Sequence, residues 1–219
     1  MRSLPCIRPL GQWLLGVEFF DPLVRIIEAD VGPIRKCRSA ATIDGFSAKA
    51  PKGRDAMLIG ILSDTHDQVA RASRAVRKLA DLGAEALIHC GDLTGPEVVH
   101  ECVGLPAYFV FGNNDYNQIG LRRAMDEIGA VCLGVSGTLT LGGRRLAVTH
   151  GDSTKEMKRL AALAPDYLFF GHTHVPTDER VGPTRWVNPG ALYRAPAWTV
   201  ALLDLEGGSL RLLTIDHAR

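Results

Sequence analysis

The sequence predicts an α/β protein in which two β-sheets pack together and helices cover their outer faces. From Met57 onward, short apolar runs of strand length alternate with segments of helical periodicity. This alternation favours a parallel sheet that is covered on its faces. Later in the chain, apolar runs come in pairs joined by Gly-Gly, as in β-hairpins. A parallel half followed by a hairpin-rich half indicates two packed sheets.

The first half is expected to hold three strands and three helices. The strands are "MLIGIL" (57–62), "ALIHC" (86–90) and "AYFVF" (107–111). The first helix covers 69–83, where apolar residues recur at helical spacing and Gly83 provides a stop. A short helix over 95–104 opens with Pro96 near its first turn, and a third covers 118–129.

The second half is expected to begin and end with a hairpin. Gly142-Gly143 joins two strands within 136–151, and Gly207-Gly208 joins two within 197–215. Between them lie a helix over 153–164, where Ser153 and Glu156 fit a capping box, and a strand within 166–171.

The first 56 residues have a different character. They contain five prolines, show no sustained period and end in the basic stretch "SAKAPKGRD". Met57 stands immediately before the first strand. We expect residues 1–56 to be a disordered extension or the product of a wrongly assigned start, and residues 57–219 to form the folded domain.

The composition is that of a globular protein, with 46% hydrophobic and 22% charged residues among 219. A net charge of +1 gives no general attraction to nucleic acid or anionic membrane, so an anionic substrate needs local charge such as a bound metal.

Five scattered cysteines argue against a disulfide framework and for a reducing compartment. No apolar run approaches the roughly 18 residues of a membrane span, and the cytoplasm is the expected location.

Polar clusters follow five of the expected strands, and most of the clusters contain glycine. They are Asp64 with His66, Asp92, Asn113 with Asn114, His150, and His172 with His174. In α/β sheets, ligands bind in the crevice beyond the carboxyl ends of the strands. Aspartate, histidine and asparagine without thiolates suit a metal such as Mn²⁺, Fe²⁺ or Zn²⁺.

Each cluster alone also has a structural explanation. Asp64 could cap a helix, "GNND" and "GHTH" could be turns, and His150 could be a core histidine. However, four of the seven histidines fall in these clusters, which independent turns would not explain. Of the others, His89 is expected to be a buried hydrogen-bonded residue or to support the ligands, and His100 and His217 to lie at the surface.

Together, "DTH", "GD", "GNND", "HGD" and "GHTH" resemble the calcineurin-like metallophosphoesterases, in particular their small YfcE-like phosphodiesterase branch. "NPGA" at 188–191 resembles the NPGS element of that branch, and the resemblance extends from Met57 to the C-terminus. It implies a four-layer α/β/β/α sandwich of two mixed sheets flanked by helices. It also implies a phosphodiesterase in which a metal-bridging hydroxide attacks the ester.

The resemblance implies a site for two divalent ions, with Mn²⁺ the first expectation and Fe, Zn, Ni or Co the alternatives. One ion would be bound by Asp64, His66, Asp92 and His174. The other would be bound by Asp92, Asn113, His150 and His172, so that Asp92 bridges the pair.

Asn114 departs from the broad superfamily, many of whose members carry histidine at this place. An asparagine can donate a hydrogen bond to a phosphoryl oxygen but cannot deliver a proton. We therefore expect weak turnover of esters with poor leaving groups and better turnover of activated esters or diesters. Asp115 is expected to support the loop.

Two alternatives stay open: a protein-binding scaffold like the retromer subunit that shares this fold, and a phosphomonoesterase or nucleotide pyrophosphatase using the same site. The expected partner is a small phosphate ester; no membrane partner is expected. A nucleic-acid substrate is not supported, because no basic run with interleaved aromatics lies near the motifs. A homo-oligomer is left open. Substrate choice is assigned to loops such as Thr177–Arg185 and Tyr193–Trp198.

Overall fold

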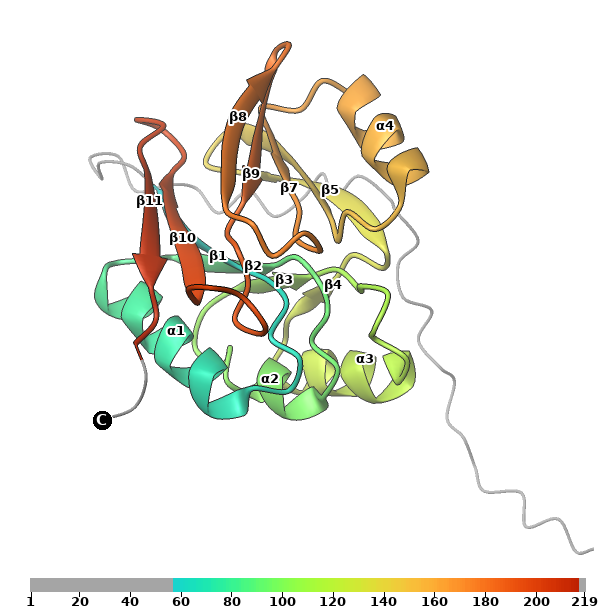
Figure 1. Cartoon of the computed structure of the whole chain (residues 1–219), viewed down its shortest axis with the longest axis vertical. Helices are drawn as coiled ribbons and strands as arrows, with labels where there is room; N and C mark the ends of the chain where they lie inside the picture. The colour runs from blue at the N-terminus through green and yellow to red at the C-terminus, as the bar shows by residue number, and fades with distance from the viewer. Residues whose placement is uncertain (1–56, 217–219) are drawn as a thin grey trace, which may run out of the picture. The chain divides into compact units, whose positions relative to one another are not determined.

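The computed structural model describes residues 57–216, which form a sandwich of two mixed sheets with helices on both outer faces (Figure 1). The extension expected over residues 1–56 lies outside the described residues. The first sheet has the strand order β11 (Leu210–Thr214), β10 (Thr199–Asp204), β1 (Leu58–Leu62), β2 (Ala86–His89), β3 (Ala107–Phe109) and β4 (Val131–Cys132). The second has the order β5 (Ser136–Leu141), β6 (Arg144–Thr149), β7 (Tyr167–Phe169), β9 (Thr184–Asn188) and β8 (Thr177–Val181).

Parallel strands form the centre of each sheet, and three of the four sheet edges are antiparallel strands, the exception being β4. β1 to β4 are parallel, and the β10–β11 hairpin adds antiparallel to β1, with Ile59 opposite Leu203. In the second sheet, β6, β7 and β9 are parallel, and the β5 and β8 strands pair antiparallel at the two edges. The parallel strands therefore bring several carboxyl ends to one side of the sandwich, where ligands bind in such sheets.

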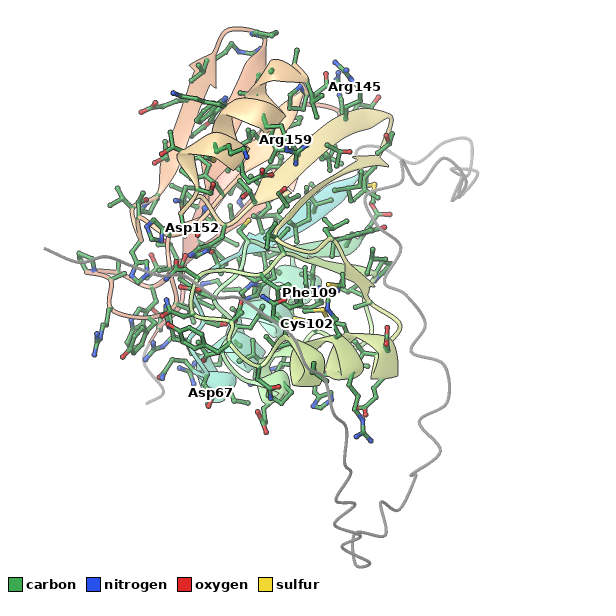
Figure 2. The ribbon with its side chains drawn as sticks, turned by 90° about the vertical axis from the view of Figure 1, so that its right-hand side faces the viewer. Asp67, Cys102, Phe109, Arg145, Asp152 and Arg159 are labelled. Carbon is green, nitrogen blue, oxygen red and sulfur yellow. The ribbon has the colours of Figure 1, made fainter. Side chains whose placement is uncertain are left out.

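Three apolar layers separate the four layers of secondary structure. Between the sheets, Ile59 and Ile61 of β1 pack with Leu146 and Val148 of β6. Outside the first sheet, its other face packs on α1 (Val69–Asp81), α2 (Pro96–His100) and α3 (Gln118–Glu127). Phe109 and Cys102 lie in this layer (Figure 2). Leu160 of α4 (Thr154–Ala162) packs on the outer face of the second sheet. The expected four-layer fold is confirmed.

The helices are close to those predicted, with one shortened. α2 ends at His100 rather than at 104. Ser153 caps α4 as expected by accepting a hydrogen bond from the backbone N–H of Glu156, whereas the Glu156 carboxylate bonds Ser136. Within residues 57–216, no helix has both the length and the apolar character needed to cross a membrane.

Two structural elements were not predicted from the sequence. The segment Thr177–Arg185, assigned to a loop, forms most of the β8–β9 hairpin, and the short β4 was also missed. β8 reads Thr-Asp-Glu-Arg-Val and is mostly exposed, so no apolar alternation marks it. β4 has only two residues, which is too short to give a pattern.

Candidate metal centre

The five polar clusters converge on one side of the sandwich. Each follows a strand: β1 for Asp64 and His66, β2 for Asp92, β3 for Asn113 and Asn114, β6 for His150, and β7 for His172 and His174. A cavity of about 350 Å³ lies at this edge. It is lined by six of these eight residues, namely His66, Asp92, Asn113, Asn114, His172 and His174. The other two, Asp64 and His150, are fully buried.

Carboxylate and imidazole atoms meet in two tight groups. Asp64, His66 and His174 form one, and Asp64, Asp92 and His150 form the other. The Oδ1 atom of Asp64 lies 3.2 Å from Nε2 of His174. Two ligand atoms that each lie about 2.1 Å from one ion are separated by about 3.0–3.4 Å. The spacing is thus that of neighbouring ligands of one ion.

Asp92 lies between histidines that the family resemblance assigns to different ions. Its Oδ2 atom is 3.3 Å from Nε2 of His66 and 3.3 Å from Nε2 of His150. A single carboxylate oxygen next to one ligand from each set is what a bridging position requires. The groups also differ from the expected ligand sets. Asp64 belongs to both, with its Oδ1 4.0 Å from Nε2 of His150, whereas Asp92 is absent from the first group and His172 from both.

Two buried atoms in the centre lack a hydrogen-bond partner among the described residues. They are Oδ1 of Asp64 and Nε2 of His150. The other polar atom of each side chain forms a hydrogen bond. Oδ2 of Asp64 accepts from Ser63 Oγ at 2.6 Å, and Nδ1 of His150 donates to the Cys90 carbonyl at 2.9 Å. A buried polar atom without a partner costs free energy of folding. Here the hydrogen bond on the other atom of the same side chain fixes the direction in which the unpartnered atom points. This arrangement fits a metal ion.

The charges in the centre are strongly coupled. Burial alone would raise the pKa of Asp92, yet contacts with His150, His66 and Asn114 hold it well below its usual range. Burial alone would lower the pKa of His150, yet Asp92, with Asp64 and the Cys90 carbonyl, raises it to about 9. Without a metal, Asp92 is therefore ionised and His150 is protonated at neutral pH.

Backbone strain is concentrated in the same loops. Five of the seven predicted ligands have a left-handed φ, namely Asp64 (53°), His66 (41°), Asp92 (56°), His172 (66°) and His174 (58°). This conformation costs roughly 1–2 kcal/mol for a residue with a side chain, and such residues gather at functional sites. The absence of a side chain at Gly112 is also required, because a Cβ there would overlap Oδ1 of Asp92.

Asp115 holds the loops after β2 and β3 together. Its carboxylate accepts hydrogen bonds from the backbone N–H groups of Asp92 at 2.9 Å, Thr94 at 2.8 Å and Gly112 at 2.8 Å. The side chain is buried, and burial raises its pKa against the opposing effect of these bonds. The supporting role expected for Asp115 therefore has a definite form: one carboxylate fixes the backbone on both sides of a predicted ligand.

His89 connects the loops that follow β1 and β2. Its Nδ1 accepts from the Gly91 N–H at 3.1 Å, so Nε2 carries the proton and donates to Thr65 Oγ at 3.1 Å. The Thr65 hydroxyl in turn donates to the Asp92 carbonyl at 3.3 Å. Burial and the nearby His150 lower the pKa of His89 to about 3, so the ring stays neutral. Its position is the supporting one expected for a buried histidine.

Replacing His89 with phenylalanine is expected to lower the free energy of unfolding of the metal-free protein by about 1–3 kcal/mol, because the buried Gly91 N–H loses its acceptor. Denaturant midpoints measured in the presence of a chelator give this value. His100→Gln is the control, since His100 forms only an exposed ion pair with Glu127 and its loss costs at most about 1 kcal/mol. Equal midpoints for wild type and His89→Phe would contradict the assignment.

The "NPGA" element supports the last histidine loop. The Asn188 amide donates to the Gly171 carbonyl at 2.8 Å and to Thr173 Oγ at 3.1 Å, while its Oδ1 accepts from the Gly190 N–H at 2.9 Å. Asn188 is fully buried. It therefore holds the backbone before His172 and the side chain after it, a role that sequence reasoning did not give it.

Asn113, Asn114 and His172 reach the cavity in different ways. Asn113 lies exposed at its wall, and the His172 ring meets the His150 ring edge-on with centroids 5.1 Å apart. Asn114 bonds both oxygens of Asp92, through its backbone N–H at 2.8 Å and its Nδ2 at 2.7 Å. The contact of Asn114 with a phosphate stays a prediction, and this structure adds that one of its amide protons is held by Asp92.

Tyr193 and Arg194 complete the cavity lining. The sequence placed them in a loop of interest but gave neither a role. The Tyr193 ring packs against the His66 ring, with centroids 4.7 Å apart. The Arg194 carbonyl accepts from Nδ1 of His174 at 3.3 Å, which leaves Nε2 of that ring facing Asp64. The one available signal was their position directly after the "NPGA" element.

The two-sheet sandwich brings aspartate, histidine and asparagine together at its strand ends, and this donor set defines a candidate metal-binding protein. A model of the calcineurin-like phosphoesterase superfamily domain matches residues 57–208. The chain therefore belongs to the calcineurin-like phosphoesterase superfamily, and it is a phosphoesterase.

Named relatives agree with this family. A phosphodiesterase of Methanocaldococcus jannaschii is 30% identical over 167 residues, which cover 73% of this chain and all of the relative. A solved archaeal phosphodiesterase superposes with a TM-score of 0.68 at 27% identity and covers 72% of this chain and 99% of its own. The phosphoesterase Yfce of E. coli superposes with a TM-score of 0.56 at 21% identity, over 73% of this chain and 100% of its own, a likeness of fold alone.

Proposed function

We propose that the protein is a two-metal-dependent phosphodiesterase. The observation that carries this proposal is the position of Asp92, whose Oδ2 lies 3.3 Å from both His66 and His150. The relatives named as phosphodiesterases support the substrate class. Asp64, His66, Asp92 and His174 would hold one ion, and Asp92, Asn113, His150 and His172 the other.

The donor set explains why an anionic ester would be attracted. When bound, two divalent ions would polarise the phosphoryl group and generate a nucleophile from water at neutral pH. Only two carboxylates, Asp64 and Asp92, belong to the two groups, so the chain neutralises only part of the ionic charge. Asn113 is an uncharged donor at the cavity wall, which preserves the remaining positive charge. Oxygen and nitrogen donors without thiolates suit Mn²⁺, Fe²⁺ or Zn²⁺, and burial raises the pKa of the nearby Cys90 thiol, which disfavours a thiolate ligand.

Asn114 limits which leaving groups the site can expel. A phosphomonoester or diester with a poor leaving group needs a proton as its bond breaks, and an amide cannot supply one. Every imidazole that lines the cavity belongs to a predicted ligand, namely His66, His172 and His174. A substrate whose leaving group departs without a proton suits this site best.

The test is a matrix of metals and substrates with protein first stripped by a chelator. Mn²⁺, Fe²⁺, Co²⁺, Ni²⁺ and Zn²⁺ are each tried with bis-(p-nitrophenyl) phosphate and with p-nitrophenyl phosphate. We expect two ions per chain and faster turnover of the diester. Preferred monoester turnover would contradict the proposed preference for diesters. A chain that binds no metal and hydrolyses neither ester would favour the scaffold alternative.

The affinity for metal is expected to rise with pH. In the metal-free protein His150 has a pKa of about 9, whereas a ligand imidazole must be neutral, so binding expels a proton below that pH. The logarithm of the association constant should climb by up to about one unit per pH unit and level off near pH 9. Calorimetric titration with Mn²⁺ in buffers of different ionisation enthalpy measures both the constant and the released proton. A constant that does not change with pH would contradict this coupling.

A further inference from the structure

Among the described residues that line the cavity over the centre, one carries a permanent positive charge, the exposed Arg194. The remaining lining residues are predicted ligands, the amide of Asn114 and the aromatic ring of Tyr193. No carboxylate of the described residues pairs with the Arg194 guanidinium. Its charge is therefore available to a ligand in the cavity.

The backbone of Arg194 is fixed by the fold. Its φ is +44°, a strained value for a residue with a side chain, and its carbonyl accepts from Nδ1 of His174. The guanidinium lies 5.0 Å from the centroid of the Tyr193 ring, which itself packs on the His66 ring. The backbone and side-chain contacts of this pair therefore tie it to histidines of the predicted metal site.

The loop that carries Tyr193 and Arg194 is anchored at both ends by one residue of α1. Arg71 donates a hydrogen bond from Nη1 to the Leu192 carbonyl, before the pair. Its guanidinium also stacks 3.2 Å from the centroid of the Trp198 ring, after the pair. These two contacts of Arg71 fix the loop before and after the pair. Arg194 therefore lies on an ordered segment at the cavity wall.

We infer that Arg194 binds the phosphate of the substrate, donating to its non-bridging oxygens while the ester is held at the metal centre. This inference rests on the proposed function. A planar guanidinium matches two phosphate oxygens and forms charge-assisted hydrogen bonds with them. Asn114 is a neutral amide with one proton engaged by Asp92, so it can offer a phosphate only its remaining proton. Arg194 would add a full positive charge and paired donors to what the ions supply.

Arg194→Ala is an informative variant because the contact with His174 uses the backbone carbonyl and survives the change. The full-length protein loaded with Mn²⁺ is compared with Arg194→Ala, Arg194→Lys and the control Arg77→Ala, which removes an exposed charge of α1. The readouts are metal content, the dissociation constant of inorganic phosphate by calorimetry, and kcat/KM for bis-(p-nitrophenyl) phosphate. Phosphate binding needs no turnover, so it remains measurable if the protein hydrolyses no diester and the proposed function fails.

We expect Arg194→Ala to weaken phosphate binding and lower kcat/KM by about 10- to 100-fold while the metal content stays at the wild-type value. Arg194→Lys keeps the charge without the paired donors, so it should recover part of the loss. Arg77→Ala should stay within about twofold of wild type. Unchanged phosphate affinity in Arg194→Ala would overturn the inference. A loss of bound metal in that variant would also overturn it, since the side chain would then act through the centre.

Discussion

Replacing Asp92 with asparagine is expected to lower phosphodiesterase activity by at least about 10³-fold. The change removes a charge from the oxygen that lies 3.3 Å from both His66 and His150, so both ions would lose a shared ligand. Lewis-acid stabilisation by bound ions is worth several kcal/mol in the transition state, and about 1.4 kcal/mol corresponds to tenfold in rate. Loss of one ion alone therefore accounts for three orders of magnitude.

Metal analysis separates this cause from a general failure to fold. The Asp92→Asn variant should retain the circular dichroism of the wild type and bind fewer than two ions per chain, because asparagine can still accept the hydrogen bond from the backbone of Asn114. Asp126→Asn on α3 is the matched control, since it is exposed and lies outside the centre. An Asp92→Asn protein that keeps two ions and more than about a tenth of the activity would contradict a bridging role.

The fold was predictable where burial dictates the pattern. Strands β1, β2 and β3 are buried on both faces and read as continuous apolar runs, and the Gly-Gly turns marked both hairpins that flank the second half. The β8–β9 hairpin escaped because β8 is mostly exposed and carries three charged residues. Its position is set by the β7–β9 pairing, a long-range contact that no local pattern encodes.

The candidate site was predictable to the level of which residues converge. Asp64, Asp92 and His150 follow strands whose carboxyl ends meet, so chain order and sheet topology were sufficient to bring them together. The groups that hold them could not be found in this way. The bond from Asn188 to Gly171 depends on loop shapes that neither segment specifies alone. The same holds for the packing of Tyr193 on the His66 ring.

Replacing Asn114 with histidine is expected to raise the turnover of esters with poor leaving groups by about 10²- to 10⁴-fold, the usual range for general acid catalysis. Asn114 lines the cavity beside Asp92, so an imidazole at this place would lie within reach of a departing oxygen. Activated p-nitrophenyl esters should gain little, because nitrophenolate leaves without a proton. The measurement is the dependence of kcat on the leaving-group pKa for a series of phenyl phosphate esters, which should become shallower in the variant.

The pH profile distinguishes proton donation from a change in shape. An imidazole acts as an acid only while protonated, so the gain in Asn114→His should decrease as the pH rises above the ordinary histidine pKa of about 6.5. Asn114→Gln is the control, since it keeps an amide donor and adds no titratable group. A gain shared by both variants, or one that persists unchanged at high pH, would show that size and not acidity limits this site. A gain confined to histidine and to low pH would mean that one amide in the loop after β3 sets which esters the enzyme cleaves.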